Sequence, residues 1–135
     1  MPEATTSIPP CVFCRRLLTG PFIASNELAV AFEDAFPLSR GHSLIIPRRH
    51  QPDFLALEPE DQEAIWALLP EVTAFIERSG TPDGYNIGIN VNAAAGQTVA
   101  HAHVHVIPRH EGDVPDARGG VRWVLPTKAR YWETP

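Results

Sequence analysis

Residues 101–107 have the sequence H-A-H-V-H-V-I, and this stretch decides the fold. Histidines alternate with apolar residues, and a period of two is typical of a β-strand. In a strand over residues 100–107 the imidazoles of His101, His103 and His105 point to one face, with Cα atoms roughly 6.5 Å apart. The alternative is the solvated face of an edge strand. Three histidines in strict alternation favour a chemical function instead.

Imidazole ligates metals, transfers protons near neutral pH, and attacks phosphorus or acyl carbon as a nucleophile. The outer two histidines of a strand lie about 13 Å apart at Cα, too far to meet easily at one small reacting atom. His103, in the middle, has a histidine on each side. Geometry alone therefore makes His103 the best nucleophile candidate. Its second ring nitrogen then needs an acceptor, which we expect to be a backbone carbonyl, to fix the tautomer.

The rest of the chain predicts three more strands and one long helix, which together indicate an α+β fold with a mainly antiparallel sheet. Alternating or apolar runs predict strands over residues 27–32, 42–46 and 85–91. An apolar stripe predicts an amphipathic helix over residues 60–78, which Pro70 should kink or divide. Loops are expected at 33–41 and 92–98. Prolines in residues 1–10 indicate a flexible N-terminal arm, which leaves 11–135 as a single domain.

Size and composition limit the function classes. The 135 residues fit one domain, and a net charge of −5 disfavours a broad electrostatic grip on nucleic acid. No apolar run is long enough for a membrane helix, and the N-terminus lacks the features of a secretory signal, so we expect a cytoplasmic protein. In that reducing compartment the C-x-x-C of Cys11 and Cys14 indicates a metal site or a redox pair rather than a structural disulfide.

The histidine stretch resembles the signature of the histidine-triad (HIT) family of nucleotide hydrolases and transferases. Further stretches resemble the family in order and spacing, over roughly residues 11–109. They are C-V-F-C from Cys11, F-E-D from Phe32, G-H-S-L-I-I-P-R-R-H from Gly41, and N-I-G-I-N-V-N-A-A-A-G-Q-T-V before the triad. The closing segment also resembles prokaryotic members, including those called diadenosine tetraphosphate hydrolase-like, although this part is less diagnostic.

The resemblance implies a homodimer with a sheet continued across it, and a purine nucleotide or dinucleoside polyphosphate laid across the triad. The family's nucleophile is the middle histidine, here His103, which attacks the α-phosphorus. His105 would donate a hydrogen bond to the phosphate, and Gln97 and Thr98 would place donors on its oxygens or on the scissile bridge. Family transferases acting on sugar nucleotides have glutamine at the third triad position, so His105 favours hydrolysis.

The resemblance also implies the substrate-binding residues. Asp34 matches the carboxylate that holds the ribose, although an aspartate in a turn often bonds its own backbone. His42 is expected beside the site as a supporting group. Asn90 matches a phosphate-side or ribose-side amide, with Asn86 and Asn92 as alternatives. Candidates for the wall around the base are Phe13, Ile23 and Phe32, and Trp123 with Arg118 and Arg122 could reach the partner's site.

Resemblance to the zinc-containing branch implies a metal site. Its ligands would be Cys11, Cys14, His50 and His101; the alternative is two free cysteines and a surface His50. Four protein ligands make the zinc structural, so His101 would not be a free general acid.

The expected activity is hydrolysis at the α-phosphate of a dinucleoside polyphosphate or a nucleoside phosphoramidate, through a nucleotidyl-histidine. The alternatives are a nucleotide-binding sensor and a zinc-stabilised interaction module with little turnover. His103 together with Gln97, Thr98 and His105 favours the enzyme. The sequence specifies neither the leaving group nor the base.

Overall fold

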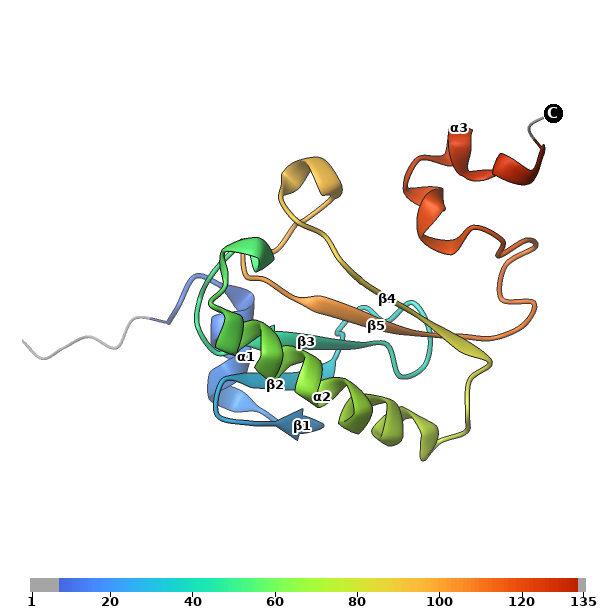
Figure 1. Ribbon diagram of the computed structural model, residues 1–135. Coiled ribbons are helices and arrows are strands. Elements are labelled where there is room, and N and C mark those ends of the chain that lie inside the picture. The colour runs from blue at the N-terminus through green and yellow to red at the C-terminus, as the bar shows by residue number, and fades with distance from the viewer. Residues whose placement is uncertain (1–7, 134–135) are drawn as a thin grey trace, which may run out of the picture.

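The computed structural model describes residues 8–133 and contains one five-stranded antiparallel sheet, in the order β1-β2-β3-β5-β4, with a long helix against it (Figure 1). The strands are β1 (Ala24–Ser25), β2 (Ala29–Glu33), β3 (Ser43–Pro47), β4 (Gly84–Ile89) and β5 (Val104–Arg109). The α-helices are α1 (Val12–Thr19), α2 (Pro59–Glu77) and α3 (Pro126–Ala129). The expected α+β fold is confirmed, with one strand and two short helices beyond those predicted.

The sheet carries apolar side chains on both faces. On one face, Ala31, Ile45 and Val104 pack against the α2 stripe of Ile65, Leu68, Val72 and Ile76. On the other, Val30, Phe32, Leu44 and Ile46 pack with Phe13 of α1. Strands covered on both sides read as continuous apolar runs, which explains why β2 and β3 show little alternation.

Helix α2 begins with Pro59 at its first turn, where a missing N–H has no effect, and with Glu60 and Asp61 near its positive end. Pro70 does not divide it, contrary to one of the expected outcomes. Apolar residues on both sides of Pro70 pack against the sheet, and this tertiary packing outweighs the local cost of a proline. Within residues 8–133, no helix has the length and apolarity that crossing a membrane requires.

The strand that carries the histidines begins later than predicted. β5 starts at Val104, so His101 and His103 precede it and only His105 lies within it. The backbone before Val104 bonds to other loops: the N–H of Ala102 donates to the carbonyl of Gln51 at 2.7 Å. Gln51 lies far from Ala102 in the sequence, so a local periodicity cannot indicate this contact.

The N-terminal helix α1 was not predicted. Cys11 caps it, its Sγ accepting a hydrogen bond from the N–H of Cys14 at 3.4 Å. Of the expected N-terminal arm, residues 1–7 lie outside the described residues, whereas the carbonyls of Pro9 and Pro10 accept hydrogen bonds from Arg15. Helix α1 thus begins within the C-x-x-C motif.

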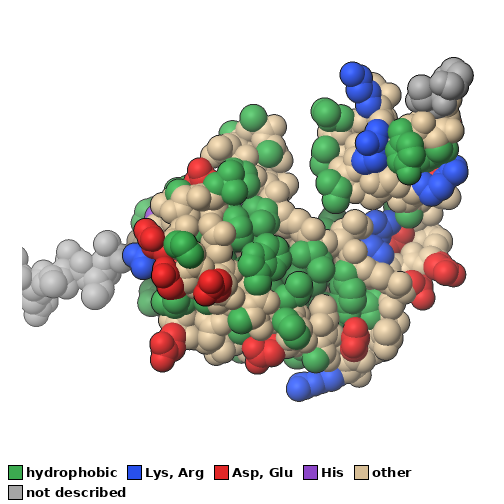
Figure 2. Space-filling view, viewed as in Figure 1, with side chains coloured by type: hydrophobic (Ala, Val, Ile, Leu, Met, Phe, Trp, Pro, Cys, Tyr) green, Lys and Arg blue, Asp and Glu red, His purple; other side chains and the backbone are tan. Residues whose placement is uncertain are grey.

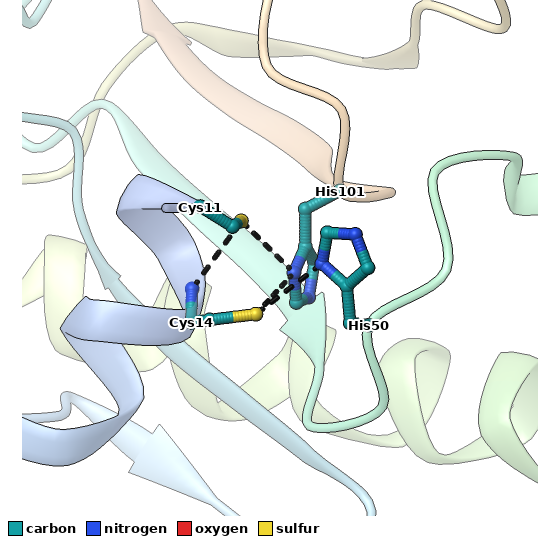
Figure 3. Close-up of side chains that lie close together, drawn as sticks. All are labelled: Cys11, Cys14, His50 and His101. Carbon is teal, nitrogen blue, oxygen red and sulfur yellow. Dashed lines mark hydrogen bonds between the residues drawn. The ribbon is translucent and has the colours of Figure 1, made fainter. Parts of the chain in front are cut away.

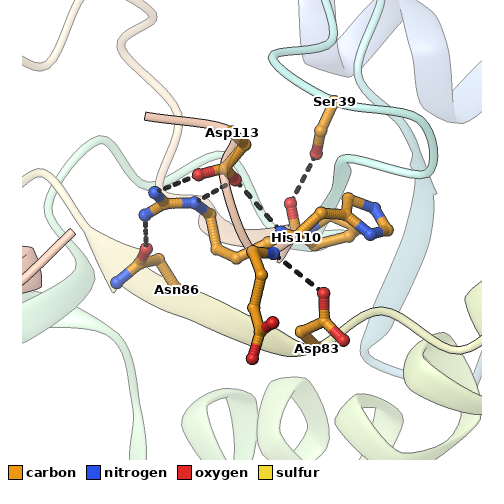
Figure 4. A network of polar contacts seen from close by, with 8 residues as sticks. Ser39, Asp83, Asn86, His110 and Asp113 are labelled. Carbon is orange, nitrogen blue, oxygen red and sulfur yellow. Dashed lines mark hydrogen bonds and ion pairs between the residues drawn. The ribbon is translucent and has the colours of Figure 1, made fainter. Parts of the chain in front are cut away.

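The C-terminal segment leaves β5 at a polar network (Figure 4). Arg109 makes two hydrogen bonds to the carboxylate of Asp113, at 2.7 and 2.8 Å, and a third to Asn86 on β4. The N–H of Glu111 donates to Asp83, which lies just before β4. Beyond this network the tail folds on itself through arginine–aromatic pairs, including Arg118 over Trp132 and Arg130 over Trp123.

Candidate active site and metal centre

The three histidines lie along the sheet face that α1 covers. The rings of His103 and His105 are neighbours, with centroids 5.0 Å apart, and Phe13 of α1 stands edge-on to His103 at 5.1 Å. His101 is fully buried, and His103 is 6% exposed. Such burial is unusual for two polar rings and requires that their nitrogens have partners.

His103 has a defined tautomer. Its Nδ1 lies 2.8 Å from the carbonyl oxygen of His101, which can only accept. Nδ1 therefore carries the proton and donates, and Nε2 keeps its lone pair. The expected backbone acceptor is confirmed. A neutral imidazole with a free Nε2 is the form that attacks an electrophilic phosphorus.

His105 is oriented by His42. The N–H of Leu38 donates to Nδ1 of His42 at 3.0 Å, so the proton of a neutral His42 sits on Nε2. That Nε2 lies 2.9 Å from Nδ1 of His105 and donates to it. The remaining N–H of His105, on Nε2, is then a donor. These two contacts place His42 beside His105, where a supporting group was expected.

Burial keeps this pair of histidines neutral. Burial, followed by the neighbouring His103 and His42, lowers the pKa of His105 to about 4, and Asp34 only partly opposes this. Burial also lowers the pKa of His42, against the attraction of Asp34. Asp34, His42 and His105 are close enough to hold a metal ion. A protonated Nε2 on His42 has no lone pair for a metal, so the geometry favours the hydrogen-bond chain.

Asp34 serves its own turn and also faces the site. One carboxylate oxygen accepts the N–H of Phe36 at 2.8 Å, as the turn alternative predicts. The other lies 3.5 Å from Nε2 of His42. Phe32, two residues earlier, is buried on the same sheet face as Phe13, at 5.7 Å between ring centroids.

The remaining predicted residues lie in loops. The amide of Gln97 organises its own loop, accepting the N–H of Asn92 and donating to the carbonyls of Pro52 and Val99. Thr98 is exposed, and Asn90 follows β4 half-buried. Of the alternatives, Asn86 is held by Arg109 at the far end of β4. The phosphate-binding roles of Gln97, Thr98 and Asn90 stay predictions.

The three candidates for the wall around the base do not lie together. Phe13 and Phe32 pack together beside His103. Ile23 packs into the core on the α2 face instead, so its assignment to this wall is wrong. Ile23 directly precedes the two-residue strand β1, and its N–H donates to the carbonyl of Ala31 on β2. A strand this short does not show as a pattern in the sequence. The i, i+4 spacing of Phe13 and Leu17 was the signal that could have revealed α1 and its buried face.

A second cluster brings together Cys11, Cys14, His50 and His101 (Figure 3). All four candidate ligand atoms lie within 4.8 Å of one another. Sγ of Cys11 and Sγ of Cys14 lie 3.5 and 3.6 Å from Nδ1 of His101, and Sγ of Cys14 lies 3.2 Å from Nδ1 of His50. Helix α1, the segment after β3 and the triad segment therefore meet at one point.

These residues fit zinc. A tetrahedral site with Zn–S of about 2.3 Å and Zn–N of about 2.0 Å requires sulfur–nitrogen separations of about 3.5 Å. The three observed separations lie near that value. Nε2 of His101 donates to the carbonyl of Pro47 at 2.8 Å, which leaves Nδ1 as the ligand nitrogen. Burial and the neighbouring Cys11 raise the pKa of Cys14, so a thiolate here needs a cation.

Comparison with known proteins places this geometry in a family. Residues 18–112 match the HIT domain. An uncharacterized HIT-like protein of Mycoplasma genitalium is 37% identical over 82% of this chain and 79% of its own. The Arabidopsis thaliana adenylylsulfatase HINT3 is 35% identical over 82% of this chain and 58% of its own. The Schizosaccharomyces pombe asymmetrical bis(5'-nucleosyl)-tetraphosphatase is 38% identical over 65% of this chain and 48% of its own.

A solved structure resembles nearly the whole chain. A zinc-bound histidine triad family protein from Mycobacterium smegmatis superposes with a TM-score of 0.67 and 33% identity, over 93% of this chain and 98% of its own. The matched family, the shared α+β fold and the four-residue cysteine–histidine cluster agree with one another. This chain therefore belongs to the HIT domain family.

Proposed function

We propose that this protein is a nucleotidyl hydrolase that cleaves at the α-phosphate of a dinucleoside polyphosphate or a nucleoside phosphoramidate. The observation that carries the proposal is the 2.8 Å contact between Nδ1 of His103 and the carbonyl of His101. It leaves the lone pair of Nε2 available for attack. The adenylylsulfatase and tetraphosphatase activities of two relatives support a reaction at a nucleotide phosphate.

The reaction we propose has two displacements. Nε2 of His103 forms a bond to the α-phosphorus, and the bond from phosphorus to the leaving group breaks, with the electron pair going to that group. Water then attacks the phosphorus, the phosphorus–nitrogen bond breaks, and a nucleoside monophosphate leaves. The Nε2–H of His105 donates to a phosphate oxygen as charge develops there, with Thr98 placing a further donor.

His101 takes no part in proton transfer in this scheme. Its Nε2–H is held by Pro47, and its Nδ1 faces the cysteines. We propose that zinc bound by Cys11, Cys14, His50 and His101 links α1 to the triad segment and supplies folding free energy. The leaving group then takes its proton from solvent.

We also propose a homodimer, in which a second copy covers an apolar face of the sheet and helix. Hydrophobic side chains form a band across this view of the molecule (Figure 2). Trp66 on α2 is 41% exposed and Ile87 on β4 is 37% exposed. β4 is an edge strand, whose outer backbone groups can pair with another strand.

The experiment is to incubate the protein with adenosine 5'-phosphoramidate and with diadenosine tri- and tetraphosphates, and to measure release of AMP. We expect turnover by the wild type and a loss of several orders of magnitude in His103→Asn, which removes the nucleophile and replaces none of the proposed metal ligands. A sensor would bind nucleotide without turnover. An interaction module would do neither.

A further inference from the structure

Arg16 lies at the far end of the aromatic wall that begins at His103. It stands three residues after Phe13 on α1, so both side chains face the sheet. Its guanidinium carbon lies 4.7 Å above the centre of the Phe32 ring and 5.9 Å from that of Phe22. The order of contacts is therefore His103, Phe13, Phe32 and Arg16.

One nitrogen of Arg16 is buried without a hydrogen-bond partner. NH2 donates to the carbonyl of Pro21 at 2.7 Å, whereas NH1 is buried and finds no acceptor among the described residues. Leaving a buried charged donor unpaired costs about 1–3 kcal/mol or more. Most buried polar groups in native proteins are paired, so this exception requires an explanation. One explanation is that a bound ligand supplies the acceptor.

The position of this nitrogen agrees with the proposed path of the nucleotide. With the α-phosphate at His103 and the ribose at Asp34, the base would lie toward Phe32, which is two residues from Asp34 in the chain and is buried in the cluster that includes Phe13. Arg16 covers that ring. As a residue Arg16 is only partly buried, so rotation about its terminal bonds can turn NH1 toward an arriving base.

Guanidinium has donors only, so it selects a base by its acceptors. The N7 and O6 atoms of guanine are adjacent acceptors, and hypoxanthine carries the same pair. Adenine places its N6 amino group, a donor, where guanine has O6. A guanidinium that donates to this edge of the base therefore favours 6-oxopurines over adenine.

We propose that Arg16 is the residue that sets base preference, and that the site prefers guanine and hypoxanthine nucleotides over adenine nucleotides. This inference rests on the proposed nucleotide site. A good arginine–guanine contact is worth about 1–3 kcal/mol of discrimination, so the expected preference is about tenfold.

The test is equilibrium binding of GMP, IMP and AMP to the full chain by calorimetry, with the metal it carries when purified. IMP shares O6 and N7 with GMP and lacks its 2-amino group, so it isolates the contact with Arg16. We expect GMP and IMP to bind about tenfold more tightly than AMP. In Arg16→Met, which keeps the length and removes the donors, the three affinities should converge.

Arg15→Met is the matched control. Arg15 neighbours Arg16 on α1, but its guanidinium bonds the carbonyls of Pro9 and Pro10, so this variant should keep the wild-type preference. If Arg16→Met fails to fold, Arg16→Lys is the variant to test. It keeps the positive charge and should show a preference between those of wild type and Arg16→Met.

Two outcomes would overturn the proposal. Equal or tighter binding of AMP by the wild type would contradict the base preference. An unchanged GMP-to-AMP ratio in Arg16→Met with a lowered melting temperature would assign Arg16 to packing alone. No binding of any of the three nucleotides would instead overturn the proposed function on which this inference depends.

Discussion

Nε2 of His42 lies 2.9 Å from Nδ1 of His105, which joins two residues 63 positions apart in the chain. Because Leu38 donates to the other nitrogen of His42, the direction of this hydrogen bond is fixed. His42 thereby determines which nitrogen of His105 carries a proton, and in the proposed mechanism this proton is offered to a phosphate. In that mechanism His42 is a positioning residue.

His42→Ala should lower kcat/KM by about 10- to 100-fold, the range typical of residues that orient a functional histidine. The loss should fall mainly on kcat, because the donor to the developing charge is misoriented while other nucleotide contacts remain. His110→Ala, at an exposed histidine beyond β5, is the control and should behave as the wild type. An unchanged kcat/KM in a folded His42→Ala would show that the contact has no catalytic role.

Acidification should destabilise the protein through His105. Its pKa falls from 6.5 to about 4 on folding, so below pH 6.5 the unfolded chain takes up a proton that the folded chain does not. Stability from this group is present above pH 6.5 and is lost progressively toward pH 4. The difference in unfolding free energy between wild type and His105→Asn should therefore shrink between pH 7.5 and 5. A difference that stays constant or grows would contradict the lowered pKa.

Zinc should be present at about one ion per chain, and its removal should lower the melting temperature. Elemental analysis of protein purified without chelator measures the first, and thermal denaturation before and after chelation measures the second. Cys14→Ser should bind less metal and unfold at a lower temperature. Its kcat, measured at a temperature where it remains folded, should change less. Metal-free protein of full stability would contradict the assignment.

Asp34→Asn separates the two roles of Asp34. Asparagine keeps an oxygen for the N–H of Phe36, so the turn should persist, while the charge that faces His42 and the proposed ribose position is lost. We expect KM to rise about tenfold for a ribonucleotide substrate, a loss typical of a hydrogen bond to a charged group. The analogue without ribose hydroxyls should bind wild type and variant alike. An equal rise in KM for both substrates would assign Asp34 to the turn only.

Local patterns predicted the parts of the fold that depend on local spacing. The apolar stripe over residues 60–78 and the alternation over residues 85–91 predicted helix α2 and strand β4 to within a few residues. The start of β5 was missed because it depends on the bond between Ala102 and Gln51, which no periodicity encodes. Helix α1 was missed because it has only eight residues and overlaps the C-x-x-C, which indicated only a metal or redox site.

At the site, too, local spacing predicted some features, and contacts between distant segments determine the others. The alternation of the triad identified His103 as the middle ring, and the expected backbone acceptor for it is present. The proposed zinc ligands could be grouped only through resemblance to a family, since three separate segments supply them. The unpaired nitrogen of Arg16 could not be foreseen, because it depends on how α1 packs over Phe32.

The covalent role of His103 is tested most directly by the stereochemistry at phosphorus. The wild type would hydrolyse a nucleoside phosphorothioate substrate of known configuration in oxygen-18 water, and the configuration of the product would be determined. Two in-line displacements, first by Nε2 of His103 and then by water, predict net retention. Net inversion would mean that water attacks the α-phosphorus directly, and it would contradict the nucleotidyl-histidine intermediate.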